Sequence, residues 1–326
     1  MIDFRYHIVS LAAVLIALSI GIVLGAGPLN DNIGSTLSGE VTKLRQEKED
    51  LRAQANEQRR QIEGRDAYDE QTLSKVVGGQ LSGQRVTLLT LPQAEADDTA
   101  ALRETLEMSG ATVADPIGVT ADWAAVGDAA VQARSETGAA ALRDLAVAEA
   151  VPDGAQRVDQ ALAVVLTGKS SDPDSPEVDG DQRQEAWTRL RDAGLVDGPD
   201  EAPVASDLVV VLGGPVPAEG EAGADAVDRA AEATAGTWVA LTHLVQTRAK
   251  GTVLAAAEAD AGTVDASPVT MARMPGSLAE EVSTVDVPSL PLGRAATVLA
   301  LVEQLGGESG HYGLGASADA PLPEAP

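Results

Sequence analysis

The stretch IVSLAAVLIALSIGIVLGAG, residues 8–27, holds no charged side chain and begins after only seven residues of the chain. In a helix, a stretch of this length rises about 30 Å, which is the thickness of the hydrocarbon core of a bilayer. Asp3, Arg5 and His7 lie before it, and Asn30 and Asp31 follow it. Because charges are costly at bilayer depth, this pattern predicts a transmembrane helix that anchors the chain, within residues 1–30.

Two other interpretations of this stretch stay open: a cleaved export signal and a buried helix of a soluble domain. Gly25-Ala26-Gly27 offers a poor cleavage site, and the apolar run is longer than the roughly 7–15 residues that a signal needs. For orientation, Arg5 favours a cytoplasmic N-terminus, although Lys43 and Arg45 weaken the difference in charge across the membrane. We expect a single-pass protein of the cell membrane, with everything after residue 30 extracytoplasmic.

Both the apolar stretch and the segment that follows it carry a pattern typical of helix pairing. Small residues recur every fourth position in the stretch, which lets two helices pack closely in lipid. Residues 31–78 are rich in strong helix formers and place apolar residues on heptad positions, with Glu40 and Glu47 facing Arg45 and Arg52 of a parallel partner. We predict a coiled-coil stalk in a parallel homodimer; a single solvated helix is the alternative. The predicted dimer contacts are Ala13, Ala17, Gly21, Gly25, Leu37, Val41, Leu44 and Leu51.

The pattern changes after residue 79 to short apolar runs that alternate with helical segments. Strands are expected at 84–92, 110–116, 206–215, 251–258 and 283–288, and helices at 97–110, 123–148, 156–168, 181–193, 224–249 and 292–305. Asp97 or Asp98 is expected to cap the first of these helices. Alternating strands and helices predict an α/β domain over residues 79–313 with a mainly parallel, Rossmann-like sheet. Residues 314–326 lack core-forming periodicity, and we expect a disordered tail there.

Charge and composition exclude several functions. The net charge is −27, and residues 81–326 carry nearly all of it, with 14 Lys and Arg against 39 Asp and Glu. Such a body repels phosphate backbones, so we expect no nucleic-acid partner. The chain has no cysteine, histidine occurs only at positions 7, 243 and 311, and no G-x-S-x-G stretch is present. We therefore expect no catalytic residues and no enzyme.

The N-terminal sequence MIDFRYHIVSLAAVLIALSIGIVLGAGPL, the helical segment after it and GHYG at 310–313 resemble the MctB copper-transport family over nearly the whole chain. This family overlaps with SteB-type proteins, which act in cell separation with a SteA-type partner. The resemblance implies a role in copper efflux and homeostasis at the cell envelope. The alternative that it implies is a non-enzymatic, SteB-like dimeric scaffold that binds a SteA-like membrane protein or a cell-wall hydrolase to control septal wall hydrolysis.

Copper is the one metal or cofactor that the resemblance implies, and the sequence offers few ligands for it. Cu(I) prefers thiolate or thioether ligands, and the chain has four methionines and no cysteine. Met271 and Met274, in MARM, are the only close pair, and a spacing of three on a helix brings both sulfur atoms to one side. They are the candidate metal ligands, and core packing is the alternative explanation. A pore would require several chains, because one span encloses none.

Overall fold

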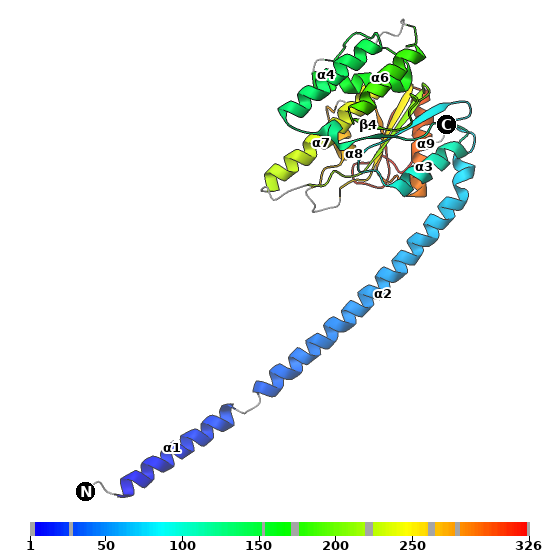
Figure 1. The fold of residues 1–326 in the computed structure, drawn as a ribbon. Helices are drawn as coiled ribbons and strands as arrows, with labels where there is room; N and C mark the ends of the chain where they lie inside the picture. The colour runs from blue at the N-terminus through cyan, green and yellow to red at the C-terminus, as the bar shows by residue number, and fades with distance from the viewer. Residues whose placement is uncertain are drawn as a thin grey trace. The chain divides into compact units, whose positions relative to one another are not determined.

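The computed structural model describes residues 4–25, 29–151, 154–170, 176–218, 224–259, 265–277 and 281–324, and the side chains of 29–38 and 224–228 lie outside the description. The chain divides into two compact units, Met1–Arg65 and Asp66–Pro326. We call the second the globular unit. Both can be followed by colour in Figure 1.

Helix α1, Phe4–Gly25, forms the start of the first unit, and all its side chains are exposed. Among the described residues it is the one helix long and apolar enough to cross a membrane, and none of it is buried in the structure. A helix of a soluble core would be covered by its own domain, and the exposure of α1 favours the other two interpretations. A retained anchor and a cleaved signal both remain compatible with an exposed apolar helix.

Helix α2, Leu29–Val77, contains no proline and is 49 residues long. It belongs to both units, because the boundary falls at Arg65. Near its C-terminal end, Leu73 and Val77 are buried together with Leu81 in the core of the globular unit. The globular unit therefore begins inside the segment predicted as stalk, and not at residue 79. Burial of these apolar side chains is the physical reason for the difference.

The globular unit is built on a mixed sheet of eight described strands, most of them parallel. The order is β4-β3-β1-β5-β6-β7-β8, with β2 also pairing with β1, and the β3–β4 pair alone is antiparallel. Crossover helices connect the parallel strands. The strands are β1 Arg85–Thr90, β2 Thr112–Val113, β3 Ile117–Val119, β4 Val196–Asp197, β5 Leu208–Gly213, β6 Gly251–Ala256, β7 Ser283–Val285 and β8 His311–Tyr312.

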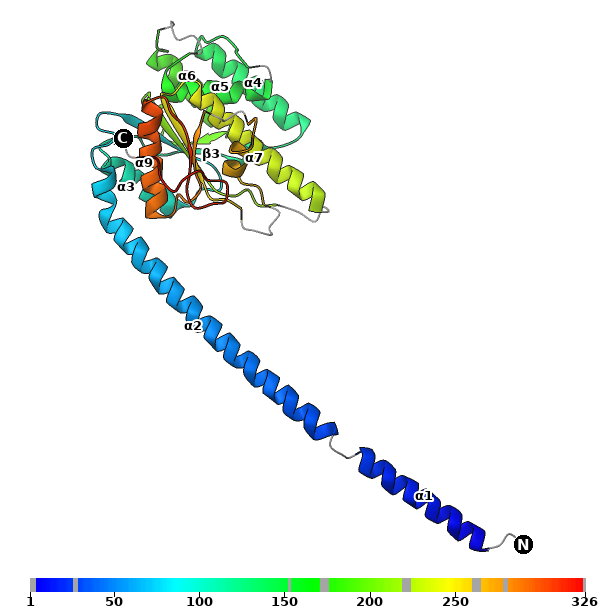
Figure 2. The same cartoon turned by 180° about the vertical axis from the view of Figure 1, so that it is seen from behind.

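Helices cover both faces of this sheet, as Figures 1 and 2 show for α4, α6 and α7 on one side and α3 and α9 on the other. Successive residues of a strand point to opposite faces, so Val209 and Val211 belong to one core and Leu208 and Val210 to the other. Two covered faces explain why the β5 sequence is continuously apolar. The helices are α3 Ala96–Met108, α4 Asp128–Asp144, α5 Arg157–Thr167, α6 Gly180–Asp192, α7 Ala224–Gln246, α8 Pro268–Ala272 and α9 Pro291–Leu305, with 3₁₀ turns η1 Ala121–Ala124 and η2 Gly154–Gln156.

Several local predictions need correction. Helix α3 has Glu95 as its N-cap, without a side-chain cap bond, so Asp97 and Asp98 lie in the first turn and cap nothing. The helix predicted at 123–148 is broken: η1 ends at Ala124, and Gly127, with φ 112°, precedes α4. A residue other than glycine rarely adopts such a φ. Strands β3, β4 and β8 and helix α8, which have two to five residues each, were not predicted.

The segment after residue 313 also differs from the expected disordered tail. The described part, up to residue 324, is attached to the globular unit by hydrogen bonds: Asp319 N–H donates to the carbonyl of His311 at 2.8 Å, and Ser317 Oγ donates to Glu258 at 2.5 Å. Leu322 packs against the core on the α3 and α9 side. Hydrogen bonds and the apolar contacts of Ala320 and Leu322 hold this segment, and neither leaves a periodic signal in the sequence.

Candidate functional site

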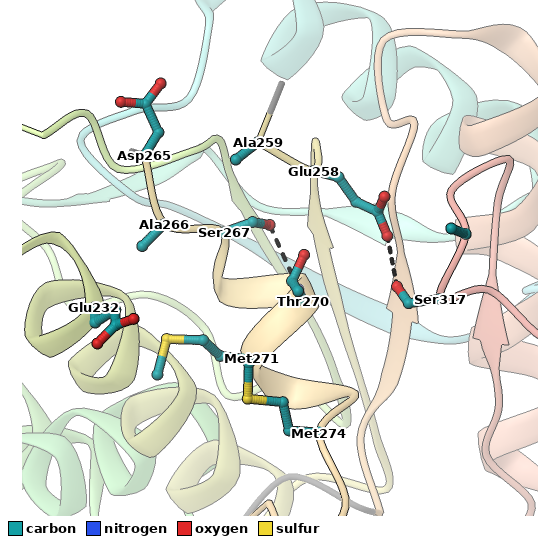
Figure 3. A pocket seen from close by; sticks show the side chains of 11 residues that line it. Glu232, Glu258, Ala259, Asp265, Ala266, Ser267, Thr270, Met271, Met274 and Ser317 are labelled. Atoms are coloured by element: carbon teal, nitrogen blue, oxygen red, sulfur yellow. Dashed lines mark hydrogen bonds between the residues drawn. The ribbon is translucent and has the colours of Figure 1, made fainter. Parts of the chain in front are cut away.

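A cavity of about 670 Å³ opens beyond the carboxyl ends of β6 and β8. Ligands of open parallel sheets bind at this edge, because the strands end there and the following loops surround a hollow. The lining comes from α7, from the loop after β6, from the start of α8 and the turn behind it, and from the segment after β8 (Figure 3). Its residues are Glu232, Glu258, Ala259, Asp265, Ala266, Ser267, Thr270, Met271, Met274, Ala316 and Ser317.

Both candidate metal ligands, Met271 and Met274, line this cavity. Ser267 caps α8 by accepting a hydrogen bond from the Thr270 N–H, and α8 ends at Ala272, so Met271 is helical and Met274 lies in the following turn. Met271 is half-buried and packs against the core, whereas 53% of Met274 is exposed. Core packing therefore accounts for part of Met271 and does not account for Met274. In Figure 3 both sulfur atoms lie on the same side of α8, and Met271 extends toward Glu232.

Three carboxylates make the cavity acidic, and no lysine or arginine is among the lining residues. Glu258 is held by Arg273 at 3.3 Å and by Ser317 at 2.5 Å. Asp265 accepts a hydrogen bond from the Ala218 N–H at 3.0 Å. Glu232, which is exposed on α7, makes no hydrogen bond or ion pair with any described residue. The cavity thus attracts cations and presents one carboxylate, that of Glu232, that is not paired within the described part of the chain.

Arg273, between the two methionines in sequence, turns away from them into the globular unit. Its side chain is 2% exposed, and Nη1 donates to Oδ2 of Asp286, itself 1% exposed, at 2.8 Å. Its Nε donates to Thr284 Oγ1 at 2.7 Å, and Nη2 donates to the Tyr312 carbonyl at 2.7 Å. A buried charge is tolerated only when it is paired and hydrogen-bonded, and Arg273 meets both conditions. The MARM segment is therefore locked onto β7 and β8.

The GHYG motif and the two residues after it contact Asp286, the acidic partner in this ion pair. Asp286 accepts hydrogen bonds from the N–H groups of Leu314, at 2.8 Å, and Gly315, at 3.1 Å. Gly313 has φ 135°, and a Cβ placed there would lie 2.0 Å from Asp286 Oδ1. Only glycine lets the backbone approach the carboxylate this closely. The sequence motif thus has a structural role: it wraps the chain around a buried carboxylate beside the cavity.

The pKa values of His311 and Tyr312, in the GHYG motif, are also shifted by their surroundings. Burial lowers the pKa of His311, and the positive charge of Arg273 lowers it further, against a smaller opposite effect of Asp319. Thr284 Oγ1 accepts from Arg273 and lies 3.0 Å from Nδ1 of His311, so the hydroxyl proton is available to that nitrogen. Burial also raises the pKa of Tyr312, whose hydroxyl donates to Glu303 at 2.5 Å. Near neutral pH both side chains are therefore uncharged.

A second cavity, of about 260 Å³, lies beyond β1 and β5, where the strand order reverses. Gln93 and Pro92 follow β1, Val216 and Pro217 follow β5, and Trp238 contributes from α7. No charged residue is among those that line it. It therefore offers an apolar hollow without ligands for a cation, and the acidic cavity at β6 and β8 is the better candidate site.

The sequence predicts two of the residues that line the cavity, Met271 and Met274, and gives no signal for the others. Met271 and Met274 can be recognised as a pair because they are close in the sequence. Glu232 and Glu258 come from separate elements, and no local signal points to them. Within the described ranges, no group of three or more His, Asp or Glu side chains is arranged to hold a metal ion, so a site made of hard ligands alone is not present there.

The predicted dimer contacts lie along the first unit and are not brought together within one chain. Val41, Leu44 and Leu51 are 39%, 62% and 65% exposed on α2. In α1 the small residues are exposed as well, and a Cβ placed on Gly21 or Gly25 would meet no atom within 4 Å. The side chain of Leu37 lies outside the described residues. A face of small residues on α1 and an apolar face on α2 are therefore available to a partner.

Fold and site together define a protein with an apolar N-terminal helix and an α/β unit that carries an acidic cavity with two thioether groups. The chain matches the model of the family described as copper transport outer membrane protein, MctB, over residues 1–323. The chain therefore belongs to the MctB family, as the resemblance in its sequence predicts.

Individual relatives agree with this family. The protein named copper transporter MctB from Mycobacterium tuberculosis is 32% identical over 328 residues, covering 97% of each chain. The protein of the same name from Mycobacterium leprae is 30% identical over 338 residues, again covering 97% of each chain. These names describe transport of copper and not catalysis. They do not mention cell separation or a SteA-type partner, so the SteB-like role stays a prediction that the comparisons do not support.

Proposed function

We propose that this chain is a single-pass membrane protein whose globular unit handles copper on the extracytoplasmic side. The observation that carries the proposal is the match to the copper-transport family over residues 1–323, joined to an apolar helix whose side chains are all exposed. An exposed helix of this composition is stable when lipid surrounds it. Arg5 before the apolar run favours a cytoplasmic N-terminus, so we assign the remainder of the chain to the outside.

The mode of action within this proposal is binding of copper by the globular unit, since one helix encloses no pore. The acidic cavity favours entry of a cation, and the mostly parallel sheet with helices on both faces places that cavity at a strand edge that commonly holds ligands. We class the fold as Rossmann-like, which the reversal of strand order between β1 and β5 supports. Any pore would have to be formed by several copies.

Copper tolerance tests this function. In the organism that carries the chain, deletion of its coding sequence is expected to raise cell-associated copper and to stop growth at a lower copper concentration, because a copper-handling protein is lost. Cell-associated copper is measured by mass spectrometry, and the same measurements with zinc are the control. Copper content and tolerance that do not change on deletion would contradict the proposal.

We further propose a parallel homodimer joined through α1 and the exposed face of α2. The chain has no cysteine, so single cysteines report pairing without background. Leu44→Cys is expected to form a disulfide-linked dimer in membranes on mild oxidation, because heptad core positions of parallel helices face each other. Gln46→Cys, on the opposite side of the heptad, is the matched control and should link poorly. Equal linking at both positions would argue for random collisions and against a coiled coil.

A further inference from the structure

Met271 and Met274 are held in place at the acidic cavity by contacts that do not involve their sulfur atoms. Ser267 caps α8, and Arg273 fixes the turn after it through Asp286, Thr284 and Tyr312. A Cβ placed on Gly236 of α7 would lie 3.5 Å from Cε of Met271, so the end of Met271 rests on α7 at a residue without a side chain. The two thioethers are thus positioned, and Met274 remains open to the cavity.

A third ligand group comes from the same helix that Met271 touches. Glu232 precedes Gly236 by four residues, and residues four apart lie on one face of a helix. Its carboxylate lines the cavity with the methionines and is not paired with any described residue, whereas Glu258 and Asp265 are committed to other groups. The cavity therefore joins two soft neutral sulfur ligands to one negative charge, which no described residue pairs.

We propose that Met271, Met274 and Glu232 form a binding site for Cu(I) in this cavity. The thioether sulfur is a soft ligand, which selects Cu(I) over hard cations such as Mg²⁺ and Ca²⁺. The carboxylate balances the single charge of the ion, and the remaining acids favour its entry. This proposal rests on the proposed function for the identity of the metal. It adds the residues by which the globular unit would bind copper.

The test is a Cu(I) titration of the purified full chain in detergent, without oxygen, against a chromogenic Cu(I) chelator. We expect the wild-type chain to bind one Cu(I). Met271→Leu and Met274→Leu are each expected to weaken binding by at least about tenfold, because replacing even an outer-shell partner commonly costs that much. Glu232→Gln is expected to weaken it as well, and the double methionine variant to bind least. Met108→Leu, on α3 in the other core, is the matched control and should bind as the wild type does.

A measurement on the wild-type chain tests the site without relying on the folding of the variants. With methyl-labelled methionine, Cu(I) should shift the methyl resonances of Met271 and Met274 and leave that of Met108 in place. Leucine and methionine have similar volumes, so the variants should also keep the melting temperature of the wild type. Unchanged resonances of Met271 and Met274, or equal affinity in the wild type and the double variant, would overturn the site.

Measuring the copper tolerance of cells distinguishes failure of the proposed Cu(I) site from failure of the proposed copper function. If the double methionine variant restores tolerance to a deletion strain as well as the wild type does, the site is wrong while the copper function stands. If the purified chain binds Cu(I) through both methionines but deletion changes no copper content, the site stands while the function falls. Loss of binding together with loss of tolerance supports both.

Discussion

Replacing Asp286 with asparagine is expected to destabilise the globular unit by about 3 kcal/mol, the lower end of the range for breaking a buried ion pair, because Arg273 keeps only its contact with the partly exposed Glu258 at 3.3 Å. The Arg273 and Asp286 side chains are 2% and 1% exposed, so water cannot replace the lost carboxylate. For a unit of this size such a loss lowers the melting temperature by about 10 °C. Tryptophan fluorescence during heating is the measurement, since Trp123, Trp187 and Trp238 are all buried in the globular unit.

A matched control for Asp286→Asn is the same change at Asp200, which is 95% exposed and pairs with Arg191 at 2.8 Å. Exposed ion pairs contribute only about 0–1 kcal/mol, so Asp200→Asn should leave the melting temperature nearly unchanged. Asp286→Asn should also release the chain around Leu314, which bonds to the carboxylate, and make it accessible to protease. Equal melting temperatures for the two variants would show that the buried pair does not stabilise the unit.

The second large effect is expected for Leu15→Arg in the middle of α1. An arginine at the centre of a membrane helix costs about 2.5–3.5 kcal/mol, and the lost leucine adds roughly 0.5 kcal/mol, so membrane insertion should fall by about two to three orders of magnitude. The measurement is the fraction of full chain that stays in membranes after extraction with alkaline carbonate. We expect the wild type to stay and Leu15→Arg to be extracted.

The control for this variant is Leu15→Ile, which keeps the side chain apolar and should stay in the membrane. The mass of the mature chain must be measured as well, because a chain cut near Gly25 would be extracted whatever stands at position 15. Retention of Leu15→Arg in carbonate-washed membranes would mean that α1 does not lie in the bilayer, and a cut wild-type chain would identify residues 8–27 as a signal.

The parts of the fold that the sequence predicts are those with a long, regular pattern. The buried strand β5, the helices α5, α6, α7 and α9 and the apolar α1 each carry enough apolar residues in one period to be recognised. Strand β8 has two residues and α8 has five, and both depend on contacts with distant elements. No pattern in their own sequence specifies them.

In the candidate site, too, some residues can be predicted from the sequence and others cannot. Met271 and Met274 are neighbours in sequence and could be paired from their spacing alone. The pairing of Arg273 with Asp286, the approach of Glu232 from α7 and the exposure of Met274 depend on how β6, β7 and β8 align in the sheet. Side chains that meet only after folding leave no local signal, which is why the acidic part of the cavity was not predicted.

Contacts between the first and last parts of the globular unit also determine when the unit can fold. Glu70 near the end of α2 forms an ion pair with Arg294 of α9, and Leu73 shares a core with Tyr312 of β8. The first and last parts of the unit are therefore joined, and contacts between residues so distant along a chain slow folding. In the proposed topology, α1 enters the membrane before α9 and β8 are synthesised. The globular unit would then complete its sheet only after these last elements have crossed the membrane.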